Sequence, residues 1–149
     1  MSARDDQLAL LLERDAVADV VRRYAFGIDT RDDAMVHSCF ARDARIQGTV
    51  FSGGVEEYLS RLLAHVREFE ATMHHLGTQL IEVQDDTASA HSYAIALHFR
   101  DAAGTEEDVA VGVRYDDRLR REPGGTWRIV DRTVRSIWRR VPEPMKEDT

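Results

Sequence analysis

The sequence predicts an α+β protein in which N-terminal helices pack on a strongly curved, mainly antiparallel sheet. Two observations indicate this class. Apolar residues recur at helical spacing through the first half of the chain, and the second half contains four long extended segments joined by turn-rich sequences. The 149 residues suit one domain, which we expect to cover residues 1–140, with a flexible tail over residues 141–149.

Three helices are expected in the first half, and the longest runs from Gln7 to Ile28. Its apolar face is formed by Leu8, Leu11, Leu12, Val17, Val20, Val21, Tyr24 and Ile28. A short helix over residues 34–40 follows Thr30, whose hydroxyl is placed to cap it, with Asp33 three residues further on. After an extended piece over residues 44–48, the sequence at Ser52 opens a third helix. One side of that helix carries Tyr58, Leu59, Leu62, Leu63 and Val66.

Four strands are expected over residues 73–83, 87–99, 108–119 and 126–139. Small residues alternate with bulky ones in the second and third of these strands. The small set is Ala90, Ser92, Ala94, Ala96, Ala110 and Gly112, and His98 shares its face. We expect the small side chains to face the helices, which either allows close packing or leaves a cavity. The bulky face, with Tyr93, Ile95, Leu97, Tyr115, Ile137 and Trp138, is then expected to form the interface of a homodimer or homotrimer.

The composition argues against several classes of protein. A formal net charge of −7 disfavours nucleic acid and anionic membrane surfaces as partners, because both require a basic face. Cys39 is the single cysteine, so an internal disulfide is impossible. The charged N-terminal residues do not resemble a secretory signal, and no apolar segment approaches the length of a membrane span. We therefore expect a cytoplasmic protein.

Three residue types in the sequence suit proton transfer at carbon without a cofactor. Tyr24 and Asp29 lie five residues apart near the end of the first helix, and His74 and His75 lie near the start of a strand. An iron site formed by Asp29, His75 and His98 is an alternative, but the sequence has no compact metal-ligand motif. It also has no phosphate-binding glycine loop. We expect neither a metal nor a cofactor.

The spacing of these residues resembles that of a known family. Tyr24-x-x-x-x-Asp29 at a helix end and His75-x-Gly77 at a strand start are similar to the SnoaL-like group of the nuclear-transport-factor-2-like superfamily. The resemblance covers roughly residues 11–138 and is nearest to the branch that contains scytalone dehydratase, bile-acid 7-alpha dehydratase and hexachlorocyclohexane dehydrochlorinase. It implies a cofactor-free enzyme with a catalytic aspartate and histidine in a conical cavity between sheet and helices.

Transferred to this chain, the resemblance implies that Asp29 and His75 are the catalytic pair. The scytalone dehydratase pattern would instead select His74, and we expect only one of the two histidines to face the cavity because neighbours on a strand point to opposite sides. His74 is then a candidate for substrate binding. Tyr24 matches a pocket tyrosine of the bile-acid enzyme type, and His98 matches the second catalytic histidine of scytalone dehydratase.

Arg135 approximates an arginine of the bile-acid enzyme type if an offset of one residue is allowed, and it is carried as a substrate-binding candidate. Two further pocket tyrosines of scytalone dehydratase are replaced here by Ile28 and Gly48, which argues against scytalone as the substrate.

The expected function is that of a lyase or isomerase acting on a hydrophobic, oxygenated ring compound of polyketide, steroid or terpenoid type. Asp29 would orient the imidazole of His75, which would remove a proton next to a carbonyl or a leaving group. Tyr24 or His98 would donate a hydrogen bond to the developing oxyanion. The alternative is a noncatalytic small-molecule-binding or assembly module of the same fold.

Overall fold

The computed structural model describes residues 2–101 and 108–141. Its elements follow in the order α1 (Ala3–Thr30), α2 (Asp33–Ser38), β1 (Phe40–Gln47), β2 (Ser52–Gly54), α3 (Val55–Val66), β3 (Ala71–Gln84), β4 (Thr87–Phe99), β5 (Val109–Arg121) and β6 (Trp127–Arg140). The expected tail lies outside the described residues, apart from Val141. Among the described residues, no helix combines the length and the apolar character needed to cross a bilayer.

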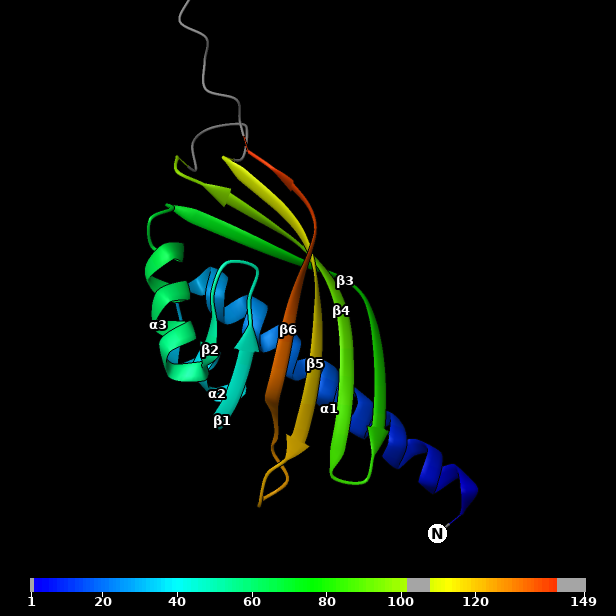
Figure 1. Ribbon diagram of the computed structural model, residues 1–149. Coiled ribbons are helices and arrows are strands. Elements are labelled where there is room, and N and C mark those ends of the chain that lie inside the picture. The colour runs from blue at the N-terminus through cyan, green and yellow to red at the C-terminus, as the bar shows by residue number, and fades with distance from the viewer. Residues whose placement is uncertain (1, 102–107, 142–149) are drawn as a thin grey trace, which may run out of the picture.

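The six strands form one sheet in the order β2-β1-β6-β5-β4-β3. Its pairs are antiparallel except for β1 and β6, which run parallel. Figure 1 shows long strands that bend strongly, with α1 crossing the sheet on one side and α3 near β1 and β2. The α+β class and the mainly antiparallel, curved sheet predicted from the sequence are confirmed.

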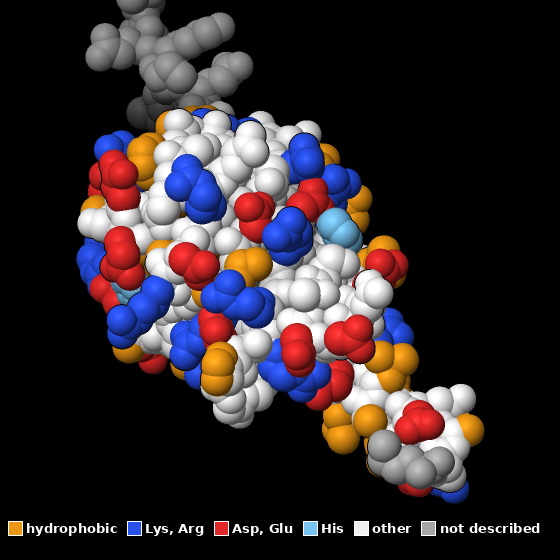
Figure 2. All heavy atoms as spheres, turned by 60° about the horizontal axis from the view of Figure 1, so that its bottom comes forward, with side chains coloured by type: hydrophobic (Ala, Val, Ile, Leu, Met, Phe, Trp, Pro, Cys, Tyr) orange, Lys and Arg blue, Asp and Glu red, His pale blue; other side chains and the backbone are white. Residues whose placement is uncertain are grey.

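Helix α1 is longer at both ends than predicted. Ser2 and Asp5 form a capping box at its start, which satisfies backbone N–H groups that have no partner inside the helix. The buried positions begin only at Val17, so the first turns extend beyond the sheet (Figure 1). This projecting end appears at the lower right in Figure 2 and carries exposed hydrophobic side chains, namely Leu8, Leu10, Leu11 and Leu12.

The prediction that Thr30 caps the second helix was wrong. Thr30 still belongs to α1, and its hydroxyl donates to the carbonyl of Phe26 at 2.8 Å. Helix α1 ends at Arg31, which adopts the left-handed conformation with φ 59°. Asp32 caps α2 instead, because its carboxylate accepts a hydrogen bond from the backbone N–H of Met35 at 3.0 Å. The end of α1 lies at the start of β3, where Arg31 bonds the hydroxyl of Thr72.

The inner face of the sheet combines small and large side chains from neighbouring strands. On β4 the expected small residues, including Ser92 and Ala94, point inward and are buried. On β5, however, Tyr115 lies opposite Ser92 and Val113 lies opposite Ala94, so the bulky residues of β5 also point inward. The prediction that Tyr115 belongs to an outer interface was therefore wrong. The small row on β4 leaves the space that the large row on β5 fills.

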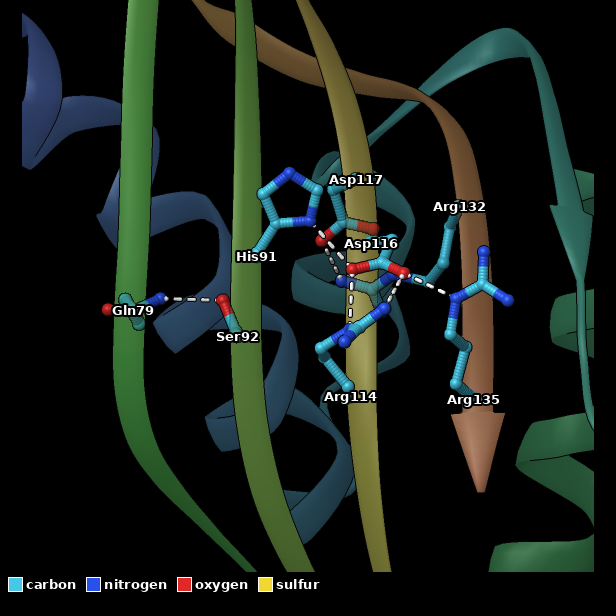
Figure 3. Close-up of polar contacts among 8 residues, drawn as sticks. All are labelled: Gln79, His91, Ser92, Arg114, Asp116, Asp117, Arg132 and Arg135. Atoms are coloured by element: carbon cyan, nitrogen blue, oxygen red, sulfur yellow. Dashed lines mark hydrogen bonds and ion pairs between the residues drawn. The ribbon is translucent and has the colours of Figure 1, made fainter. Parts of the chain in front are cut away.

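The outer face of the sheet combines an apolar patch with a charged cluster. Hydrophobic side chains that remain exposed there include Tyr93, Ile95, Ile137 and Trp138. The charged cluster consists of Asp116 with His91, Arg114 and Arg135 (Figure 3). On the face shown in Figure 2, acidic and basic side chains are interspersed.

Candidate active site

Asp29 and His74 form the central contact of the candidate site. Nδ1 of His74 lies 2.7 Å from Oδ1 of Asp29, and the backbone N–H of His74 donates to Oδ2 at 2.6 Å. The hydroxyl of Thr72 donates to Oδ1 at 2.9 Å. The carboxylate in this contact fixes the proton of the neutral imidazole on Nδ1 and leaves the lone pair on Nε2. His74 can therefore act as a base through Nε2.

The surroundings of Asp29 favour its ionised form. Burial raises the pKa of this carboxyl, but the hydrogen bonds from the His74 ring, the His74 backbone and Thr72 lower it by more. The side chain of Asp29 is 21% exposed and that of His74 is 8% exposed. Asp29 lies in the last turn of α1 and reaches across to β3, so it does not serve as an N-terminal helix cap.

The structure brings His74 rather than the expected His75 to Asp29. His75 points to the outer face, where it lines a hollow of about 280 Å³ together with Tyr93 and Trp138. The physical reason is an irregularity in β3 between Leu76 and Gln79, which places one extra residue against β4. In a regular strand, alternate residues face the same side, so His75 would share the inner face with the buried Ile81. The bulge shifts the alternation by one residue, and His74 points inward instead.

His98 lies next to the pair, as the alternation on β4 predicts. Its ring centroid is 6.2 Å from that of His74 and 4.9 Å from that of Phe69. Nδ1 of His98 lies 3.2 Å from the carbonyl oxygen of Val109, which makes it the donor and leaves Nε2 as an acceptor. Burial lowers the pKa of His98, so its imidazole is neutral at neutral pH.

Tyr24 lies in the interior on α1, one helical turn before Ile28. Its ring packs edge-on against Phe40 and Tyr115, with centroids 5.8 Å and 5.7 Å away. Burial raises the pKa of Tyr24 well above its ordinary value. The phenol therefore remains protonated and is able to donate a hydrogen bond.

The structure also reveals Arg132, which the sequence analysis did not select. Its guanidinium lies over the rings of Tyr24 and Tyr115, at 4.2 Å and 4.4 Å, and pairs with Asp117 through bonds of 2.7 Å and 2.8 Å. Arg132 is 1% exposed. Among the described residues, its Nη1 is the buried side-chain nitrogen or oxygen that has no hydrogen-bond partner. A buried N–H donor without a partner is costly, so Nη1 of Arg132 is a donor for which the described part of the protein itself supplies no acceptor.

Arg135 was expected to bind substrate, but it lies on the outer face of the sheet, away from Asp29 and His74. Arg135 lies opposite Arg114 on the outer face and is 56% exposed, and its Nε bonds Asp116 at 2.6 Å. Arg132 lies opposite Asp117 on the inner face. Figure 3 shows the two arginines on β6 with these two neighbouring aspartates. Because 132 and 135 differ by an odd number, the two side chains point to opposite sides of the strand.

Other features of the described chain lie apart from this site. Two further surface hollows, of about 420 Å³ and 710 Å³, are lined by residues around Arg23 and Cys39 and around His37 and Arg120. Neither of these hollows is lined by Asp29 or His74. The iron site considered from the sequence does not fit, because His75 points away from Asp29. Within residues 2–101 and 108–141, no three His, Cys, Asp or Glu side chains gather as a metal-ligand set.

Comparison with protein families identifies the relationship. A model of the SnoaL-like domain matches residues 9–133, which is most of the chain. The chain belongs to the SnoaL-like family. The resemblance based on Tyr24, Asp29 and the histidines of β3 is thereby confirmed at the level of the family.

Several individual proteins are similar to this SnoaL-like chain. The terrestric acid biosynthesis cluster protein E of Penicillium crustosum is 26% identical over 135 residues, which cover 86% of this chain and 85% of that protein. A putative scytalone dehydratase from Novosphingobium aromaticivorans has a TM-score of 0.75 at 19% identity, with 93% and 97% of the two chains covered. A type 2 hexachlorocyclohexane dehydrochlorinase has a TM-score of 0.77 at 17% identity, with 96% and 97% covered. At 19% and 17% identity, the similarity of these two solved structures to this chain shows that they share its fold.

Proposed function

We propose that this protein is a cofactor-independent lyase or isomerase that acts on a hydrophobic, oxygenated ring compound. The observation that carries the proposal is the contact of 2.7 Å between Asp29 and Nδ1 of His74, with the ring of a second neutral histidine, His98, 6.2 Å from that of His74. The names of the similar proteins support it, because they include a dehydratase, a dehydrochlorinase and a member of a biosynthetic cluster.

In the proposed reaction, Nε2 of His74 removes a proton from a carbon next to a carbonyl group. The electron pair of the broken C–H bond forms a double bond, and negative charge develops on the carbonyl oxygen. Asp29 stabilises the imidazolium of His74 through Nδ1–H. The proton then leaves His74 either for another carbon, which completes an isomerisation, or for the departing oxygen, which completes an elimination of water.

The developing oxyanion needs a donor that is already in place. Tyr24 can donate through its phenol, and Arg132 can donate through the unpartnered Nη1. His98 has a different role, because its protonated nitrogen is already bonded to Val109 and its free Nε2 accepts. We therefore assign His98 to a hydroxyl group of the substrate, and Tyr24 and Arg132 to the carbonyl oxygen.

The test compares Asp29→Asn and His74→Ala with His75→Ala as the matched control. A panel of hydroxylated ring ketones would be screened for turnover by the absorbance of the new conjugated double bond. We expect both site variants to lose activity by roughly 10²- to 10⁴-fold, because a positioned general base contributes about that factor. His75→Ala should retain the activity of the wild type, since His75 lies on the opposite face.

Two results would contradict the proposal. One is near-normal turnover in both Asp29→Asn and His74→Ala. The other is ligand binding by calorimetry that persists in both variants while the wild type converts none of the compounds it binds. The second result would favour the noncatalytic binding module that the same fold allows.

A further inference from the structure

Arg31 and Thr72 connect the end of α1 to Asp29 in an unbroken series of hydrogen bonds. Nη1 of Arg31 donates to the hydroxyl oxygen of Thr72 at 3.1 Å and to the carbonyl of Ile28 at 3.2 Å. Nη2 of Arg31 donates to the carbonyl of Phe69 at 3.1 Å. Thr72 in turn bonds Oδ1 of Asp29 at 2.9 Å. One guanidinium thus joins the last turn of the helix to the start of β3.

The direction of each bond in this series is fixed by chemistry. Arginine has only donors, so the oxygen of Thr72 must accept from Arg31. An ionised carboxylate has only acceptors, so the hydroxyl proton of Thr72 must point to Asp29. Thr72 is 7% exposed, which limits competition from water for either bond. The hydroxyl of Thr72 therefore has one defined orientation.

Asp29 needs such support because of its position in α1. The C-terminal end of a helix carries partial negative charge and disfavours a carboxylate, and the last turn of α1 contains no basic residue. Arg31 follows that turn and brings its positive charge to the same end. Besides His74, the described residues His98 on β4 and Tyr115 on β5 are titratable groups that interact with Asp29 from the sheet. Neither of them donates a hydrogen bond to its carboxylate.

We propose that Arg31 and Thr72 are positioning residues, which hold the Asp29 carboxylate ionised and aligned with Nδ1 of His74. This inference rests on the proposed function for its catalytic consequence. The claim that these two residues hold the Asp29 carboxylate in place does not rest on that function, because the state of Asp29 can be measured without a substrate. Neither residue contacts Nε2 of His74 in the described structure, so both act through Asp29.

The main test is Thr72→Val, which removes the hydroxyl while keeping the shape of the side chain. The carboxyl carbon of Asp29 would be titrated by NMR in the wild type, Thr72→Val, Thr72→Ser and Thr78→Val. We expect the titration midpoint of Asp29 to rise in Thr72→Val and to return toward the wild type in Thr72→Ser. Thr78→Val should match the wild type, because Thr78 is an exposed threonine on the same strand.

The kinetic expectation is that Thr72→Val lowers kcat by roughly tenfold with little change in KM, since it misaligns the base without removing a substrate contact. Arg31→Met should raise the midpoint of Asp29 by less, because the Thr72 hydroxyl remains but loses its fixed orientation. An unchanged midpoint in Thr72→Val would overturn the inference. If the wild type shows no turnover, the proposed function fails, while the titration still decides whether Thr72 and Arg31 support Asp29.

Discussion

His74 and Asp29 are 45 positions apart in the chain, yet the two residues share two hydrogen bonds, one through the ring and one through the backbone N–H of His74. The backbone bond fixes the carboxylate relative to β3 whatever the protonation state of the imidazole. This double contact distinguishes the pair from a surface ion pair between two mobile side chains. It also predicts that the alignment of α1 with β3 determines the geometry of the site.

The stability of the protein should fall as the pH decreases below the ordinary pKa of histidine, and His98 should contribute to this fall. Burial lowers the pKa of His98 below its ordinary value of 6.5. The unfolded chain therefore binds the proton at a pH where the folded protein does not. The stabilisation is complete above that ordinary value and is lost as the pH falls through the range between the unfolded and folded pKa values.

This dependence can be measured by urea unfolding at about pH 7.5 and about pH 5.5. The loss of unfolding free energy between the two values should be smaller in His98→Gln than in the wild type. His37→Gln, on α2, provides a control for the replacement of a histidine by glutamine. Equal losses in the wild type and His98→Gln would contradict the prediction.

Removing Asp117 should destabilise the fold far more than removing its neighbour Asp116. Asp117 is 1% exposed and makes two bonds to the buried Arg132, so its loss leaves a buried cation without its counter-ion. Such a change costs about 3–5 kcal/mol, whereas exposed ion pairs contribute about 1 kcal/mol or less. Asp116 is itself 15% exposed, but its partners at the outer face reach solvent. The side chains of Arg135, His91 and Arg114 are 56%, 45% and 35% exposed, so water can hydrate them when the carboxylate is lost.

The comparison of Asp117→Asn with Asp116→Asn is therefore a matched one, since the same change is made at adjacent positions on β5. The free energy of unfolding of each variant would be measured by chemical denaturation. Similar losses in the two variants would show that the Arg132 pair is not the buried, dry contact that the structure describes.

Much of the fold was predictable from the sequence because the local patterns agree with the tertiary structure. The strand of residues 87–99 was predicted with the bounds that the structure shows, since small and large residues alternate throughout it and turn sequences flank it. The role of Tyr115 was not predictable in the same way. Which face of β5 turns inward depends on its pairing with β4, and a single strand pattern does not contain that register.

The candidate site was predictable in its residue types but not in its orientation. Asp29, Tyr24 and His98 were selected, and all three lie on the inner side. His75 was preferred to His74 because His75-x-Gly77 matches the family pattern. Which of the two histidines turns inward depends on the bulge between Leu76 and Gln79, and this bulge leaves no clear signal in the sequence. Arg132 was missed since an arginine on a strand is usually exposed, and its burial depends on Asp117 from the next strand.

Cys39 should react slowly with thiol reagents in the folded protein. It is 2% exposed, and burial raises the pKa of its thiol to about 11, so the thiolate is scarce at neutral pH. Reaction with an aromatic disulfide, followed by absorbance at mild alkaline pH, should be slow in the native protein and rapid in denaturant. Cys39→Ala should retain turnover. Rapid reaction of the native protein would contradict the buried position of Cys39.

The outer face of the sheet is proposed to associate with further copies of the chain. Its exposed apolar side chains include Ile95 and Ile137, which are 40% and 55% exposed and line the same hollow beside Trp138. An apolar patch of this kind on a regular sheet favours burial in a symmetric assembly. We expect a dimer or trimer by light scattering at micromolar concentration.

The double variant Ile95→Lys/Ile137→Lys should shift that assembly to the monomer, because two buried ammonium groups without partners would oppose contact. Val50→Lys is the control, since Val50 is a 93% exposed apolar residue outside the sheet. The molar masses of the wild type, the double variant and Val50→Lys would be compared at equal protein concentration. Circular dichroism would show that each variant is folded. A monomeric wild type, or a double variant that keeps the wild-type mass, would show that this face does not hold copies of the chain together.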